Sequence, residues 1–212
     1  MCPRLVAWRE AVAADPPRRY RGERYWARPL PGFGDPRARL LVLGLAPAAH
    51  GGNRTGRIFT GDRSGDWLFR AFFRAGLANQ PVSIRAGDGL KLRGAYVTAT
   101  VRCAPPENRP LPPEIANCRS YLEEEFDVLR PRAILALGGI GFQAALSLLA
   151  ERGAPVPRPR PRFGHGARVD FGAGFPALIG SYHPSQQNTQ TGKLTEAMLD
   201  AAVALARDAA GL

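Results

Sequence analysis

Four short apolar runs, spaced along most of the chain, set the strongest limit on the fold. Each has the continuous apolar pattern of a strand buried on both faces, and segments with a helical pattern lie between them. The runs are 38–46, 95–101, 132–139 and 175–185. This alternation predicts an α/β fold with a central, mostly parallel four-stranded sheet, and the length of 212 residues fits one domain over 1–212.

Three predicted loops follow the carboxyl ends of these strands, at 44–63, 102–112 and 182–192. Ligands bind at this edge of an open parallel sheet, so the loops are the expected position of a functional site. The first loop leaves a buried strand for a long stretch rich in glycine, asparagine, threonine and arginine. Connectors of that length are usually functional or disordered.

The charge balance favours a polyanionic partner. The chain has 29 lysine and arginine residues against 18 aspartate and glutamate residues, a formal net charge of +11. Nucleic acid is the first candidate. The alternative is a high-GC genome, whose codons favour arginine and so produce the same excess of positive charge. No apolar run approaches the roughly 20 residues of a membrane span, and the first residues lack the apolar core of a secretory signal. We therefore expect a cytoplasmic protein.

Two glycine-rich motifs resemble nucleotide-binding sequences, and both are incomplete. Gly51 and Gly56 have the spacing of a phosphate-binding loop, but Arg57 and Ile58 follow where Lys and Ser or Thr are needed. The motif at 139–144 resembles a dinucleotide fingerprint after a strand, yet no acidic residue follows at the expected distance. Close packing of strand and helix is the favoured interpretation of the second motif.

Three side chains in the predicted loops are candidates for chemistry. His183 ends a strand, where it is either a general acid/base or a loop histidine bonded to backbone. Asp66 suits the first turn of a helix capped by Ser64, which leaves Asp62 as the better catalytic candidate. Phe59 is either a stacking platform for a planar ligand or an anchor of the loop in the core.

The three cysteines, Cys2, Cys103 and Cys118, do not suggest a disulfide framework. Buried structural thiols are the default interpretation. Three of the four thiolates of an iron–sulfur site are the alternative. No His or Cys pair has the spacing of a zinc site.

Several of these segments together resemble the uracil-DNA glycosylase superfamily, and within it the iron–sulfur family 5, or B-type, of thermophilic and high-GC bacteria. The most specific combination is GLAPAAHGGNRTGR with HPSQQNT, and further matches run in order along nearly the whole chain. The resemblance implies a three-layer, doubly wound α/β/α domain. It also implies a monomeric, nucleoid-associated enzyme that flips a deaminated base (uracil, and also hypoxanthine or xanthine) out of double-stranded DNA and hydrolyses its N-glycosidic bond.

The resemblance also implies roles for individual residues. Asp62 would orient water or stabilise the cationic sugar, Asn108 would contact the base, and His183 would bond the oxygen of the departing base. Phe59 would stack on the flipped base, in a pocket completed by Gly44, Ala46, Asn53 and His50. The loop of Pro184, Ser185, Gln186, Gln187 and Asn188 would enter the minor groove. Phosphate contacts are expected from Arg158, Arg160, Arg162 and Lys193.

The family pattern begins C-x-x-C-P-R-L and holds a structural 4Fe-4S cluster, to which Cys2, Cys103 and Cys118 would contribute. This chain begins Met1-Cys2-Pro-Arg-Leu, so one thiolate of the pair is missing. The start is misplaced, the chain is trimmed or the cluster is incomplete, and we favour a misplaced start. Cys2 belongs to an N-terminal extension, residues 1–36, and the cluster would pin the N-terminal helix near the DNA-facing side.

Two other classes of function compete with the glycosylase. A non-catalytic protein could use the same pocket to recognise a lesion, and the positive charge fits it equally well. Such a protein would not need His183, Asp62 and Phe59 together. An NAD- or ATP-dependent enzyme is disfavoured by the two incomplete glycine motifs.

Overall fold

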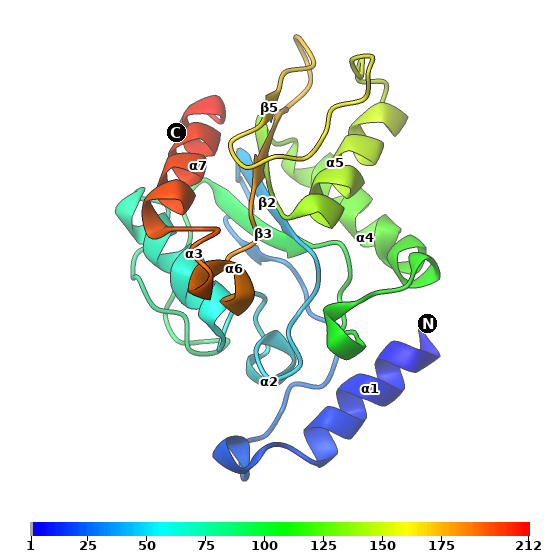
Figure 1. Ribbon diagram of the computed structural model, residues 1–212, viewed down its shortest axis with the longest axis vertical. Coiled ribbons are helices and arrows are strands. Elements are labelled where there is room, and N and C mark those ends of the chain that lie inside the picture. Colours follow the sequence, from blue (N-terminus) through cyan, green and yellow to red (C-terminus); the bar gives the residue numbers. More distant parts are fainter. Residues whose placement is uncertain (1) are drawn as a thin grey trace.

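The computed structural model describes residues 2–212 and contains one mixed sheet with helices on both faces (Figure 1). The sheet has six strands in the order β1-β3-β2-β4-β6-β5. Their bounds are β1 Phe33–Gly34, β2 Leu40–Gly44, β3 Ala95–Ala99, β4 Ala133–Leu137, β5 Arg168–Val169 and β6 Ala177–Ser181. The four strands in the centre pair in parallel, as predicted.

The prediction of a four-stranded sheet was wrong at both edges. β1 pairs antiparallel with β3, and β5 pairs antiparallel with β6. Each of these edge strands has two residues. A strand that short has no alternating pattern of its own, so only its partner in the sheet determines that it forms.

Alternating side chains of the buried strands divide the core into two layers. Leu40 and Val42 of β2 pack toward α3 (Arg63–Arg74) and α7 (Glu196–Ala209). The residues between them face α4 (Pro112–Leu129) and α5 (Gly139–Glu151) on the other side. Figure 1 shows these two pairs of helices covering opposite faces of the sheet. The strands are apolar on both faces because both faces are covered.

The N-terminal helix α1 (Pro3–Ala14) lies apart from the sheet (Figure 1). Leu5 of α1 is buried against Val101, Cys103 and Cys118. The Arg4 guanidinium also pairs with Glu114 of α4 at 2.8 Å. A 3-10 turn, η1 (Arg18–Tyr20), follows α1.

Two of the predicted loops contain short helices. The glycine-rich connector holds α2 (Gly52–Thr55), and the polar segment after β6 forms α6 (Gln186–Gln190). The Ser185 hydroxyl accepts a hydrogen bond from the Asn188 N–H at 3.3 Å and so caps α6. The loop at 102–112 contains the 3-10 turn η2 (Pro106–Asn108). Among the described residues, no helix combines the length and apolar character needed to cross a membrane.

Candidate active site

A cavity of about 620 Å³ lies at the carboxyl ends of the central strands. Residues of all three predicted loops line it: Ala46, Ala48, Phe59 and Asp62 from the first, Asn108 and its two neighbours from the second, and His183, Ser185, Gln186 and Gln187 from the third. The expectation that these loops converge is therefore confirmed. Ligand sites are expected at this edge of a parallel sheet, which makes the cavity the candidate active site.

Phe59 and His183 form a stacked pair inside this cavity. Their ring centroids are 5.6 Å apart and their planes differ by 29°. The Phe59 ring rests on the backbone of Gly44, where a Cβ would approach the ring to 2.6 Å. Gly44 therefore lies behind Phe59 and supports it. Burial lowers the pKa of His183 to about 4, so its imidazole is neutral at pH 7. A neutral ring offers one N–H donor and one acceptor.

Asp62 is the N-cap of α3, and this corrects the prediction that Ser64 holds that position. Its Oδ1 accepts a hydrogen bond from the Gly65 N–H at 3.1 Å. Its Oδ2 lies against Gly51, where any Cβ would overlap it. Burial raises the pKa of the Asp62 carboxyl, although the N–H groups of Gly65 and Ser64 oppose the shift. The carboxylate thus has a structural task as well as a place in the pocket.

A second cavity, of about 390 Å³, adjoins the first and shares Asp62, Asn108 and other lining residues with it. The two form one groove, which we call the catalytic groove. His50 lines this second part, where its Nδ1 lies 2.9 Å from the Tyr25 hydroxyl. Burial, with the charges of Arg19 and Arg54, lowers the pKa of His50.

The remaining predicted base contacts divide into two groups. Ala46 and Asn108 line the cavity, and Asn108 lies exposed at its rim with a positive φ of 56°. Asn53 lines neither part of the catalytic groove. Its side chain is fully buried, and its Nδ2 donates to the Arg9 carbonyl at 3.2 Å. Asn53 therefore joins α2 to α1 and is not brought to the predicted base pocket.

The predicted DNA contacts also separate. Ser185, Gln186 and Gln187 line the cavity. Pro184 is buried, and the Asn188 Nδ2 donates to the His183 carbonyl at 2.9 Å, so neither projects as a wedge.

The cations expected at phosphates lie elsewhere. Arg162 and Lys193 are exposed and line neither part of the catalytic groove. The Lys193 ammonium lies 4.9 Å from the centroid of the Tyr182 ring. Arg158 is also exposed, and Arg160 donates to the Ser147 hydroxyl at 3.0 Å.

Arg63 is a site residue that the sequence analysis missed. It is exposed and lines both parts of the catalytic groove, and its Nε donates to the Thr189 hydroxyl at 2.8 Å. It places a cation at the mouth of the groove, beside Asp62. Its position as the first helical residue after a buried acidic cap was the available signal.

Cys2, Cys103 and Cys118 lie in one small apolar cluster with Leu5 and Val101. Burial raises the pKa of the Cys103 and Cys118 thiols. Within residues 2–212, no three His, Cys, Asp or Glu side chains stand close enough together to form a metal site. The structure therefore brings the three thiols into one cluster without a preformed coordination geometry.

Two arginines beside these thiols, the partly buried Arg9 and the buried Arg102, have buried N–H groups without a partner among the described residues. The Arg9 Nη1 donates to the Cys103 Sγ at 3.0 Å, and its Nε has no acceptor. Arg102 precedes Cys103, and its Nε and Nη1 are also unpaired. Buried donors left unpaired are costly. An anionic group held by the thiols would supply acceptors for them, so the donor set fits an iron–sulfur cluster.

The model of the uracil DNA glycosylase superfamily matches residues 31–207. The chain belongs to this superfamily. A type-5 uracil-DNA glycosylase of Mycobacterium tuberculosis is 54% identical over 213 residues, covering 100% of this chain and 78% of that protein. The type-5 uracil-DNA glycosylase of Thermus thermophilus is 50% identical, over 100% of this chain and 94% of its own length.

Type-4 members of the superfamily are less similar to this chain than the type-5 enzymes are. A type-4 uracil-DNA glycosylase of Pyrobaculum aerophilum is 33% identical over 130 residues, or 61% of this chain. The resemblance to family 5 of the uracil-DNA glycosylases is therefore confirmed over the full chain.

Proposed function

We propose that this protein is a monofunctional uracil-DNA glycosylase of DNA repair, which removes a deaminated base and leaves an abasic site. The observation that carries the proposal is the stacked pair of Phe59 and His183 with Asp62 in the same cavity. Full-length similarity to type-5 enzymes supports it. We infer one domain over 1–212 that acts as a monomer on DNA in the nucleoid.

The reaction develops two opposite charges, a cation on the sugar and an anion on the base. His183 is neutral, so one ring N–H donates to the oxygen of the departing base as negative charge grows there. Asp62, when ionised, stabilises the sugar cation and orients the attacking water. Phe59 offers an apolar surface to the flipped base and helps to exclude bulk water.

The substrate range follows from the walls of the cavity. The segment after β2 contributes Ala46 and Ala48, which carry no group to discriminate between bases. Asn108 is the amide we assign to base contact, and it lies at the exposed rim. We infer that hypoxanthine and xanthine are accepted beside uracil. Bases in mismatched pairs cost least to extrude, so uracil and hypoxanthine in mismatched pairs are favoured.

We further infer that Cys2, Cys103 and Cys118 supply three thiolates to a structural 4Fe-4S cluster. When bound, this group supplies no catalytic chemistry and cross-links α1, the segment after β3 and α4. The sequence contains three cysteines, so the fourth ligand of the cluster is a group other than these three thiolates. The unpaired N–H groups of Arg9 and Arg102 support an anionic occupant.

Double-stranded DNA approaches the open side of the catalytic groove. Arg63 lies at its mouth, beside Gln186 and Gln187, where side chains can contact the strand around the flipped nucleotide. Arg162 and Lys193 remain our candidates for phosphate contacts further along the duplex. Such contacts make binding fall steeply with salt.

The test is an alkali-cleavage assay on labelled duplexes with one uracil opposite G or A. A cut at the uracil that appears only after hot alkali supports a monofunctional glycosylase. If no substrate with uracil, hypoxanthine or xanthine is cut, while duplexes with these bases bind more tightly than plain DNA, the protein is a non-catalytic lesion binder.

A further inference from the structure

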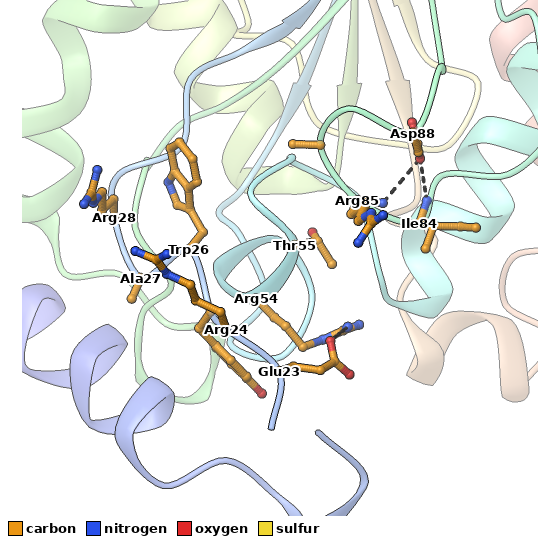
Figure 2. Close-up of a pocket in the computed structure, with 12 residues that line it drawn as sticks. Glu23, Arg24, Trp26, Ala27, Arg28, Arg54, Thr55, Ile84, Arg85 and Asp88 are labelled. Carbon is orange, nitrogen blue, oxygen red and sulfur yellow. Dashed lines mark hydrogen bonds and ion pairs between the residues drawn. The ribbon is translucent and has the colours of Figure 1, made fainter. Parts of the chain in front are cut away.

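A second hollow, of about 1170 Å³, lies beside α2 and shares no lining residue with the catalytic groove. Two segments enclose it, 23–28 and 84–88, with Arg54 and Thr55 of α2 between them. Figure 2 shows Trp26 and Arg28 on one side and Ile84 and Arg85 on the other. We call this feature the arginine hollow.

Backbone hydrogen bonds fix both segments to α2. The Trp26 N–H donates to the Arg54 carbonyl at 3.1 Å, and the Ala86 N–H donates to the Thr55 carbonyl at 3.0 Å. Beneath them, Arg57 and Asp88 form a buried ion pair at 2.8 Å. Asp88 also accepts the Ile84 N–H at 2.8 Å (Figure 2). The shape of the arginine hollow is therefore fixed by hydrogen bonds and a buried ion pair.

The arginine hollow carries a net positive charge. Both of its carboxylates are paired with arginines, whereas three further arginines are not paired with any carboxylate of the described residues. Glu23 pairs with Arg54 at 2.6 Å, as Asp88 does with Arg57. The remaining arginines of the hollow are exposed, and none forms an ion pair with a described residue within 4.0 Å. They are Arg24, Arg28 and Arg85.

Two large apolar side chains lie exposed among these cations. Trp26 is 41% exposed and Ile84 is 63% exposed. The indole is held in place, because its Nε1 donates to the Pro29 carbonyl at 3.3 Å and its ring packs against Gly56. A fixed aromatic surface within a ring of unpaired arginines is the combination that binds single-stranded nucleic acid, by stacking and by charge.

We propose that the arginine hollow binds an unpaired stretch of DNA, with phosphates on Arg24, Arg28 and Arg85 and a base stacked on Trp26. Bases in a duplex are stacked on one another, so the face of the indole is reached only by an unpaired strand. Arg54 connects this site to the catalytic groove. Its guanidinium lies 4.1 Å from the Tyr20 ring on the groove side and pairs with Glu23 on the other.

The ligand class rests on the proposed function, because DNA is the substrate of that function. The site itself is tested without any damaged base. Fluorescence anisotropy of a labelled oligothymidylate of about 20 nucleotides measures its affinity. We expect Trp26→Ala to weaken binding roughly tenfold, the loss of about one stacked base. Combined Arg24→Ser, Arg28→Ser and Arg85→Ser should lower the salt slope by about 2.

Matched controls separate this site from general surface effects. Phe73→Ala removes another exposed aromatic ring, 47% exposed on α3, and Arg37→Ser removes an exposed cation outside the arginine hollow. Both should bind the oligothymidylate as the unchanged protein does. The proposal is overturned if Trp26→Ala binds normally, if the controls weaken binding equally, or if thymidine monophosphate binds as tightly as the oligonucleotide. Thermal melting checks that each variant folds.

The two proposals can fail independently. If the protein cuts uracil-containing duplexes but oligothymidylate binding does not depend on Trp26, only the arginine hollow proposal fails. If Trp26-dependent binding is present and no deaminated base is removed, the proposed glycosylase function fails and the arginine hollow remains.

Discussion

The Asn188 side chain donates a hydrogen bond to the backbone carbonyl of His183 across 2.9 Å. A residue of α6 therefore holds the segment that carries the histidine of the catalytic groove. Asn188 thus acts as a positioning residue, and its amide is engaged within the protein.

Replacing Asn188 with alanine should slow catalysis without weakening the binding of DNA. Loss of the bond frees the His183 segment, and misplacement of a reacting group by about 1 Å can cost roughly 100-fold in rate. We expect a single-turnover rate at saturating enzyme reduced at least tenfold. If instead duplex affinity falls and the saturating rate is unchanged, Asn188 is a DNA contact.

His183→Ala should reduce the single-turnover rate by about 10²–10³-fold, the usual cost of losing one donor to a developing anion. Duplex affinity should survive, because the imidazole lies inside the cavity. The low pKa of His183, about 4, means that protonation of this ring produces no change in rate between pH 6 and 8. A rate that tracks a group titrating near 6.5 and disappears in His183→Ala would contradict this assignment.

Asp62 needs two replacements, because it has two tasks. Asp62→Asn keeps an N-cap acceptor for the Gly65 N–H but removes the charge, whereas Asp62→Ala removes both and should cost about 1 kcal/mol of stability. We expect both variants to lose most activity and only the alanine variant to melt lower. An active Asp62→Asn would show that the carboxylate serves only α3.

Burial raises the pKa of Asp62 above 3.8, the ordinary value for an aspartate. As the pH falls, Asp62 therefore loses its active ionised form before an ordinary aspartate would. The single-turnover rate should therefore decline on the acid side above that value, and in Asp62→Asn the residual rate should lack this decline. The same pKa shift affects stability in the opposite direction: the rate increases with pH, whereas the contribution of Asp62 to folding stability decreases. A carboxyl whose pKa is raised by folding makes the folded state relatively less stable as the pH rises through that pKa.

Gly44→Ala should displace the Phe59 ring, because the new Cβ would approach that ring to 2.6 Å. We expect a loss of 1–3 kcal/mol of stability, typical of overpacking by about one methyl group, and reduced activity. Gly164→Ala is the control, since its Cβ would meet Ala167 at an ordinary 3.7 Å. Equal melting temperatures for the two variants would contradict the close packing of Gly44 and Phe59.

Protein that carries the fourth thiolate of the family pattern and is prepared without oxygen should contain iron and absorb visible light, and Cys103→Ser should lose both. The expected readouts are iron per chain and the melting temperature, because the role proposed for the cluster is structural. Cys103 lies in the small core that holds α1, so its replacement should also make α1 more sensitive to protease. The proposed cluster is refuted if anaerobic preparations that also contain the fourth thiolate of the family pattern hold no iron.

The central strands and the position of the catalytic groove could be predicted from the sequence, because apolar runs and strand polarity are local patterns. The edge strands β1 and β5 could not, since each consists of two residues, too few for an apolar pattern, and β1 also pairs with a strand distant in the sequence. α6 was missed because its polar residues have no apolar periodicity, and only the Ser185 cap identifies it.

Individual roles in the site were harder to predict, because they depend on tertiary contacts. Asp62 and Ser64 are both good caps, and the course of the chain beside Gly51 favours Asp62. Asn53 looks like other polar residues of the glycine-rich connector. Only the position of α1 turns its amide toward Arg9 and away from the groove.

The bond from Asn53 to Arg9 has a consequence for communication across the molecule. It ties α2, whose Arg54 and Thr55 line the arginine hollow, to the helix that follows Cys2. A chemical change at the cysteines therefore has a short mechanical route to both proposed DNA sites, since Trp8 of the same helix lines the catalytic groove. Replacing Asn53 would remove this bond between α2 and α1 while the three thiols and the side chains assigned to catalysis stay intact.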